Sequence, residues 1–249
     1  MPEDRSVLGR SAPRPSRPWA YGPGRDQVAD VYLPDGPARD PDPAPLLLVH
    51  GGFWRPEYDR AHLRPMAAAL AELGYLTVLP EYARTPGRPD EGIDDIQAAL
   101  AGLAALVGPR EPVLVGHSAG GHLALVVAAD PAVPLRGCLA LAPVADLAMA
   151  EADDLDQGAV RAYLGSSATD RADLDPARSA RSTIPVTVVH GERDSLVPIA
   201  LSQSYCASGP ARLVAIPEAG HFELIDPLSD AWPIVIGELS ALAAPAGIE

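Results

Sequence analysis

The sequence predicts an α/β protein with a mostly parallel central sheet and helices on both faces. Strand-like runs alternate with helix-like segments along most of the chain, which is the pattern of repeated βαβ units. The inner runs, such as residues 44–50, are apolar throughout, as parallel strands are when both of their faces are buried. A length of 249 residues with 47% hydrophobic side chains is enough for one large core.

The expected elements follow in chain order. Residues 27–34 alternate apolar and polar side chains, which is typical of an outer strand, and residues 44–50 form the first fully buried strand. The later elements are a helix over 62–74, a strand over 75–82, a helix over 90–108, a strand over 111–117, a helix over 119–130, strands over 135–144, 183–191 and 211–220, and a helix over 227–242.

Two segments interrupt this alternation. Residues 1–20 carry prolines at 13, 15 and 18, so we expect a loose N-terminal arm, followed by a single domain over 21–249. The acidic stretch 146–183 lacks a strand pattern. It is either a small lid over the site or a peripheral helical excursion, and the sequence leaves both interpretations open.

Composition excludes several classes of partner. The net charge is -14, from 33 acidic and 19 basic residues, so we expect neither a nucleic acid nor a membrane as a partner. No run approaches the roughly 18 apolar residues that cross a bilayer, and we expect no secretory signal. Two cysteines make no disulfide framework, which favours a reducing, cytoplasmic location. The sequence does not determine the oligomeric state.

The strongest chemical signal is Gly116-His117-Ser118-Ala119-Gly120, a G-x-S-x-G motif between a predicted strand and a predicted helix. A strand that turns directly into a helix forces its central residue into a strained conformation, and only glycines fit beside that residue. The turn raises the serine hydroxyl above the sheet at the N-terminus of the helix. Ser118 is therefore the candidate nucleophile.

A serine nucleophile needs a base, and histidine is the usual one. His221 lies in a loop after the last predicted strand, where small neighbours let the imidazole reach across the carboxyl edge of the sheet. We therefore take His221 as the base. The other five histidines suit this role less well. His50, His122 and His190 are expected to have structural roles, His117 lies inside the turn and is expected to point away from the nucleophile, and His62 opens a helix near the surface.

The base in turn needs a carboxylate that orients it. Asp194 lies just beyond the strand predicted over 183–191 and is the candidate acid. Asp146 follows an earlier strand and is the reserve candidate, whereas Glu192 falls before the turn.

The motif "HGGFW", residues 50–54, ends the first buried strand and suits the binding of an oxyanion. Attack on a carbonyl creates a negative oxygen that must meet preorganised N–H donors. We expect one donor at Ala119 and the second at Gly52 or Phe53, where glycine lets the backbone approach a substrate. Only the amide of Phe53 is needed for this role, so its ring is equally well explained as a cover for the edge of the sheet. Trp54 is expected to form a wall of the substrate pocket.

Together, "HGGFW", "GHSAGGHLAL", "HGERDSLVP" and "AGHFELIDP" resemble the α/β-hydrolases of the kynurenine formamidase (arylformamidase) and related carboxylesterase group. The resemblance covers about residues 27–240. It implies the α/β-hydrolase fold, in which the nucleophile, acid and base follow in the order Ser118, Asp194, His221. It also implies a serine hydrolase without a cofactor and an oxyanion loop over 51–53.

The predicted function is hydrolysis of a small-acyl ester or formamide through an acyl-enzyme, with no metal because no cluster has ligand spacing. An aromatic leaving part is expected to stack on Trp54. Two other functions stay open: a catalytically slow ligand-binding or sensor module, and an acyltransferase that uses the same three residues. The stretch 146–183 is expected to supply apolar cover from Leu147, Met149, Leu155, Tyr163 and Leu164.

Overall fold

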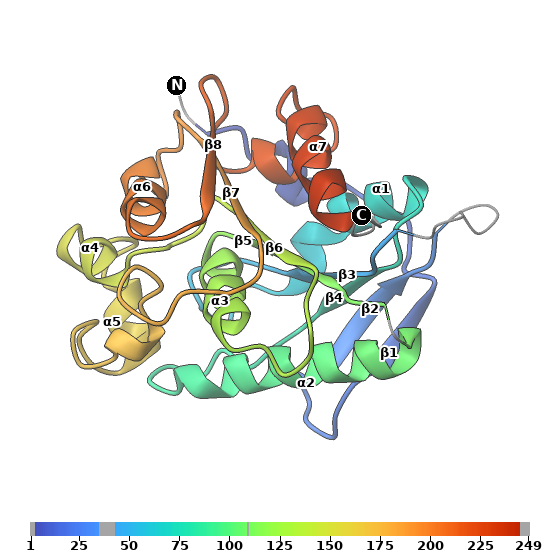
Figure 1. Ribbon diagram of the computed structural model, residues 1–249, viewed down its shortest axis with the longest axis horizontal. Coiled ribbons are helices and arrows are strands. Elements are labelled where there is room, and N and C mark those ends of the chain that lie inside the picture. Colours follow the sequence, from blue (N-terminus) through green and yellow to red (C-terminus); the bar gives the residue numbers. More distant parts are fainter. Residues whose placement is uncertain (1–2, 35–42, 109, 245–249) are drawn as a thin grey trace.

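The computed structural model describes residues 3–34, 43–108 and 110–244, and Figure 1 shows a twisted sheet between two layers of helices. The strands are β1 (Arg17–Ala20), β2 (Val28–Tyr32), β3 (Leu46–Val49), β4 (Thr77–Pro80), β5 (Val113–His117), β6 (Gly137–Leu141), β7 (Val186–Gly191) and β8 (Arg212–Ile216). The α-helices are α1 (Arg64–Glu72), α2 (Pro89–Val107), α3 (Ala119–Ala129), α4 (Leu147–Ala152), α5 (Ala159–Leu164), α6 (Ile199–Ala207) and α7 (Trp232–Ala243). Short 3-10 helices are η1 (Ser6–Gly9), η2 (Arg60–Leu63), η3 (Ala172–Leu174) and η4 (Glu223–Ile225).

The eight strands form one sheet in the order β1-β2-β4-β3-β5-β6-β7-β8. The pairs β1–β2 and β2–β4 are antiparallel, and every pair from β4 through β8 is parallel. The prediction of a mostly parallel sheet is therefore confirmed. The prediction of β2 as an outer strand is wrong, because β1 covers its free side and Asp30, in the middle of β2, is buried.

Alternate residues of the inner strands enter two separate cores. In β3, Leu46 and Leu48 pack on one side of the sheet, and Leu47 and Val49 pack on the other. Helices α1 and α7 cover the core that contains Leu46 and Leu48. Helices α2, α3 and α6 cover the core that contains Leu47 and Val49, on the opposite face of the sheet in Figure 1. This confirms helices on both faces and explains why the inner strands are apolar throughout.

Helix α2 shows how the sequence sets the bounds of an element. It begins with Pro89, whose missing N–H costs nothing in the first turn, and Asp90 and Glu91 stabilise the positive end of the helix dipole. It ends before Gly108, which adopts a φ of 70°. Within the described ranges, no helix is long and apolar enough to span a membrane.

The N-terminal segment is part of the domain. In place of the loose arm expected over 1–20, the segment 3–20 is mostly exposed but is anchored to the sheet and its loops at several points. Val7 is buried, Arg10 makes a two-pronged ion pair with Asp226 at 2.6 and 2.7 Å, and β1 pairs with β2. The expectation was wrong because these contacts join residues far apart in sequence, which a local pattern does not report.

The stretch 146–183 holds α4, α5 and η3, and it is tied to the body of the protein at several points. Arg55 donates to the carboxylate and the carbonyl of Asp156 at 2.7 and 2.6 Å. The N–H of Gly87 donates to the carbonyls of Ala162 and Tyr163 at 2.9 and 3.1 Å. Whether this stretch moves as a lid stays a prediction.

Candidate active site

Ser118 occupies a strained turn between β5 and α3. Its φ of 57° and ψ of -123° lie in a region that non-glycine residues rarely adopt. The turn fits because Gly120 has no side chain: a Cβ there would collide with the carbonyls of Val49 and His50. The first turn of α3 can therefore press against the end of β3, and the Ser118 side chain is held above the carboxyl edge of the sheet.

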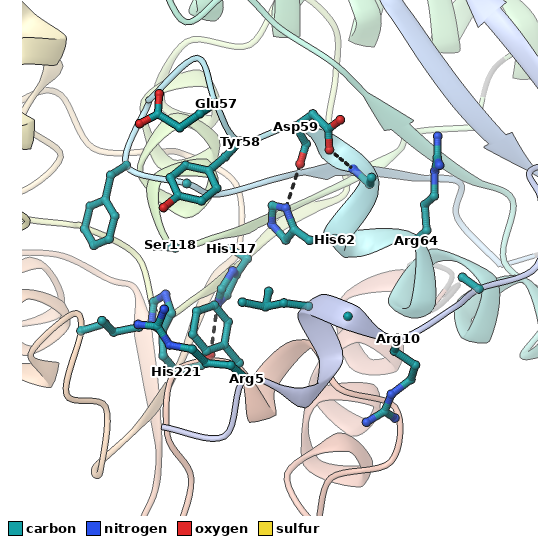
Figure 2. Close-up of a pocket in the computed structure, with 18 of the residues that line it drawn as sticks. Arg5, Arg10, Glu57, Tyr58, Asp59, His62, Arg64, His117, Ser118 and His221 are labelled. Carbon is teal, nitrogen blue, oxygen red and sulfur yellow. Dashed lines mark hydrogen bonds between the residues drawn. The ribbon is translucent and has the colours of Figure 1, made fainter. Parts of the chain in front are cut away.

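Ser118 opens onto a pocket of about 670 Å³. Figure 2 shows Glu57, Tyr58 and Asp59 on one side of this pocket and Arg5 and Arg10 on the other. The lining comes from the N-terminal segment (Arg5, Leu8, Gly9, Arg10, Ser11 and Ala12), from the chain after β3 (Gly52, Phe53, Glu57, Tyr58, Asp59, Ala61, His62 and Arg64) and from loops at the sheet edge (His117, Ser118, Asp156, Leu196, His221 and Phe222).

Asp194 and His221 are joined as the sequence predicts. Nδ1 of His221 lies 2.6 Å from Oδ2 of Asp194. Burial works to raise the pKa of Asp194, but hydrogen bonds from His190 and His221 outweigh it and hold that pKa well below its usual value. The carboxylate is thus an acceptor only, so Nδ1 carries the proton and Nε2 of His221 is left to accept one.

The remaining acceptor sites of Asp194 are also used. Oδ1 accepts the backbone N–H groups of Leu196 and Val197 at 2.9 and 2.7 Å. Nε2 of His190 lies 3.3 Å from Oδ2. The Asp194 side chain is fully buried, and these bonds fix its orientation before any substrate binds.

The two alternative acids are placed elsewhere. Asp146 caps α4, with Oδ1 accepting the Met149 N–H at 2.8 Å and Arg178 at 2.6 Å. Its Oδ2 accepts the Ser204 hydroxyl at 2.6 Å. Glu192 is exposed. Neither group lines the pocket.

The loop over residues 51–54 has the backbone that an oxyanion site needs. Gly52, Phe53 and Trp54 all have positive φ, of 115°, 49° and 56°. A Cβ on Gly51 would lie 2.9 Å from Cβ of Ser118, so glycine lets this loop reach the nucleophile.

Three backbone amides are available near Ser118. Gly52 and Phe53 line the pocket, and among the described residues neither of their N–H groups has a protein acceptor. Ala119 is the first residue of α3, where N–H groups have no acceptor within the helix. This arrangement matches the donors predicted for an oxyanion, and that role stays a prediction.

A buried charge network lies beneath the same loop. Nε2 of His50 lies 2.7 Å from Oε1 of Glu81, and Nδ1 lies 2.8 Å from the carbonyl of Gly51. Glu81 also accepts from Arg84 and, at 3.1 Å, from the N–H of Arg60. Burial works to raise the pKa of Glu81, but the bonds from His50 and the charges of His50 and Arg84 outweigh it and lower the pKa to about 2.

Trp54 is not on the pocket, contrary to the prediction. Its indole is only 3% exposed and stacks on Tyr163, with ring centroids 4.5 Å apart and planes 14° apart. It also meets the edge of His122 at 5.1 Å. The reason is that burying the large indole against a second ring is more favourable than leaving it at an open wall.

The apolar cover expected from the stretch 146–183 is also absent from the pocket. Of this stretch, Asp156 alone lines it among the described residues. The side chains predicted as cover pack into the core that holds Trp54: Leu147, Met149, Leu155, Tyr163 and Leu164.

Two histidines that we did not take as the base, His62 and His117, line the pocket, although His117 was expected to point away from the nucleophile. His62, in η2, donates from Nδ1 to the carbonyl of Asp59 at 2.8 Å, and burial lowers its pKa to about 4. His117 donates from Nε2 to the carbonyl of His221 at 3.1 Å, and its ring lies 4.5 Å from the ring of that residue. Burial lowers the pKa of His117 well below its usual value. Both rings are therefore uncharged near neutral pH.

Metal-ligating side chains do not gather here. In residues 3–34, 43–108 and 110–244, no three His, Cys, Asp or Glu side chains lie close enough together to hold a metal ion.

Comparison with known proteins gives matches along most of the chain. A family model described as the Alpha/beta hydrolase family matches residues 46–230. The esterase LipQ of Mycobacterium tuberculosis is 30% identical over 220 residues, which cover 76% of this chain and 51% of LipQ. A kynurenine formamidase of Danio rerio is 26% identical over 135 residues, which cover 51% of this chain and 45% of that protein. The chain therefore spans about half the length of these curated relatives.

Solved structures share the fold. Esterase B of Lactobacillus rhamnosis superimposes with a TM-score of 0.75, covering 96% of this chain and 90% of that one, at 20% sequence identity. Similarity at this identity shows the fold alone, because one fold hosts many activities.

Proposed function

The chain belongs to the alpha/beta hydrolase family, and on that premise we propose that it is a serine esterase with Ser118 as nucleophile, His221 as base and Asp194 as orienting acid. One observation carries the proposal. The 2.6 Å bond between Asp194 and His221 leaves Nε2 as a proton acceptor in the same pocket that the strained Ser118 lines.

The first half of the proposed reaction forms an acyl-enzyme. Nε2 of His221 takes the hydroxyl proton as Oγ of Ser118 attacks the carbonyl carbon of the substrate. The carbonyl π bond opens, and its oxygen becomes an oxyanion near the amides of Phe53 and Ala119. The tetrahedral intermediate collapses, the bond to the leaving alcohol breaks, and His221 returns its proton to that alcohol.

The second half repeats these steps with water. His221 takes a proton from water, whose oxygen attacks the acyl carbon, and then returns that proton to Oγ of Ser118 as the acid leaves. Asp194 stays ionised throughout and balances the imidazolium that forms twice per cycle. Its lowered pKa supports this role.

For substrates, we propose small-acyl esters, with formamides as a second class. The pocket mixes apolar side chains such as Phe53 and Phe222 with the charged Arg5, Glu57 and Arg64. A long alkyl chain would have to lie against those charged groups and desolvate them, which disfavours lipids. The similarity to a kynurenine formamidase is the observation that favours formamides as well.

A substrate series tests this proposal. We expect kcat/KM for p-nitrophenyl esters to be highest for acetate and propionate and to fall steadily toward palmitate. Ser118→Ala should lose turnover by on the order of a millionfold. Ser179→Ala, outside the pocket, is the matched control and should keep full activity. A maximum at long acyl chains would contradict the substrate class, and activity retained by Ser118→Ala would contradict the mechanism.

Formamides need a separate measurement. Hydrolysis of formanilides by the unaltered protein, with loss in Ser118→Ala, would support the second substrate class. Ester turnover without any formanilide turnover would remove that class and leave the esterase proposal standing.

A further inference from the structure

The carboxylate of Glu3 bridges the two loops that carry Asp194 and His221. Its Oε2 accepts the backbone N–H of His221 at 2.8 Å. Its Oε1 accepts the backbone N–H and the hydroxyl of Ser195, the residue after Asp194, at 2.6 and 3.0 Å. One side chain from the start of the chain thus holds the loop after β7 and the loop after β8 at a fixed separation.

The Glu3 carboxylate fits against the backbone here because residue 220 is a glycine. A Cβ on Gly220 would collide with Oε2 of Glu3, and it would lie 3.2 Å from Oε2 of Glu223. Glu223 accepts the N–H of Gly220. The absence of a side chain at 220 therefore lets the Glu3 carboxylate contact the backbone next to the base.

The rest of the N-terminal segment is anchored on the same side of the pocket. The guanidinium of Arg5 lies 5.5 Å from the centre of the Phe222 ring, next to His221. Val7 is buried at 1% exposure, and Arg10 is paired with Asp226. These contacts fix Glu3 from its C-terminal side, and Figure 2 shows Arg5 and His221 among the residues that line the pocket.

We propose that Glu3 is a positioning residue, which sets the place of the His221 imidazole relative to Asp194 through their two backbones. The proposal rests on the proposed function of His221. Hydrogen bonds that N–H groups donate to a carboxylate are short and strong, so they restrain both loops before substrate binds. Glu3 does not line the pocket, so it acts on the reaction only through the loops that it joins.

The first test compares two variants of Glu3 with a control. Glu3→Ala should lower kcat by on the order of 10- to 100-fold, because small misplacements of a reacting group are costly, and should leave KM within about threefold. Glu3→Gln keeps the size of the side chain but turns an NH2 group toward one of the N–H donors, so it should lose nearly as much. Glu218→Gln removes a charge from the loop after β8 without touching His221 or Ser195, and should keep full kcat.

The outcomes separate positioning from packing. If the Glu3→Gln variant keeps the kcat of the unaltered protein while Glu3→Ala loses it, the side chain merely fills space and the proposal is overturned. If both variants fold, as thermal melting reports, and both keep full kcat, the proposal is also overturned. Failure of Ser118→Ala to lose activity would instead reject the proposed function itself.

A double-mutant cycle gives a second test that does not depend on removing Glu3. Gly220 does not have a positive φ, so its backbone suits alanine, and the added Cβ would collide with the Glu3 carboxylate and lie at a tighter 3.2 Å from Oε2 of Glu223. We expect Gly220→Ala to lower kcat as Glu3→Ala does, and the double variant to lose no more than Glu3→Ala alone. Losses that multiply would mean that the two changes act on separate contacts, which contradicts the proposal.

Discussion

Asp194 and Asp146 both follow strands at the carboxyl edge of the sheet, and their bonds distinguish them. Asp194 accepts from His221, which lines the pocket, at 2.6 Å. The carboxylate of Asp146 instead accepts hydrogen bonds from the Met149 N–H at the start of α4, from Arg178 and from Ser204. Their contacts therefore differ: Asp194 is bound to a histidine that lines the pocket, whereas Asp146 stabilises the start of α4.

We expect Asp194→Asn to lower kcat by about four orders of magnitude, because the amide favours the wrong tautomer of the His221 imidazole. Asp146→Asn should keep kcat within a few-fold and lower the free energy of unfolding by about 1 kcal/mol, through a weaker cap of α4. Steady-state kinetics and urea unfolding of both variants check this. An inactive Asp146→Asn variant beside an active Asp194→Asn variant would contradict this assignment of the acid.

Trp54 and Phe53 are neighbours with opposite roles. Trp54→Ala removes a buried indole stacked on Tyr163, so it should lower the free energy of unfolding by roughly 3–5 kcal/mol. Phe53→Ala changes a side chain that lines the pocket, so it should raise KM and cost less stability. Urea unfolding and KM for phenyl acetate test the pair. A Trp54→Ala variant that is fully stable but has a raised KM would return the indole to the pocket wall.

At the scale of elements, the loop after β3 depends on the charges beneath it. Positive φ is costly at the non-glycine residues Phe53 and Trp54, and it persists only where the surroundings hold the backbone in place. His50 joins the carbonyl of Gly51 to the carboxylate of Glu81, which is bound in turn by Arg84 and Arg60. The loop over residues 51–54 is thus held by groups that do not line the pocket.

Glu81 contributes to the pH dependence of the free energy of unfolding. Its pKa falls from the usual 4.5 to about 2 in the folded protein, so its contribution is complete above about pH 4.5 and is lost as pH falls toward 2. Glu81→Gln should therefore cost roughly 3 kcal/mol at pH 7, and the difference from the unaltered protein should shrink between those two pH values. Denaturant unfolding as a function of pH measures this. A difference that stays constant down to pH 2 would contradict the lowered pKa of Glu81 in the folded protein.

At the scale of the whole molecule, the sequence predicts the features that local patterns encode. The inner strands, α2, and the turn at Ser118 each follow from runs of fewer than about twenty residues, and they appear where expected. Asp194 and His221 could be predicted because both follow a recognisable strand, and parallel strands bring their carboxyl ends to one edge.

Features made by distant residues could not be predicted in this way. Trp54 is buried by Tyr163, more than a hundred residues later in the chain. β1 is a short strand that contains Pro18 and has mostly exposed side chains, so it has no apolar pattern of its own. Glu3 meets His221 across a separation of 218 residues. No periodicity in the sequence records these contacts.

The most direct test of the account is covalent labelling with a fluorophosphonate, because this reagent reacts with an activated serine through the same attack that begins ester hydrolysis. Intact mass should show one adduct per chain, and peptide mapping should place it on Ser118. His221→Gln should slow the labelling by orders of magnitude, and Ser118→Ala should show no adduct. An adduct on another serine, or equal labelling of the Ser118→Ala variant, would contradict the central claim that Ser118, His221 and Asp194 act together as the catalytic site.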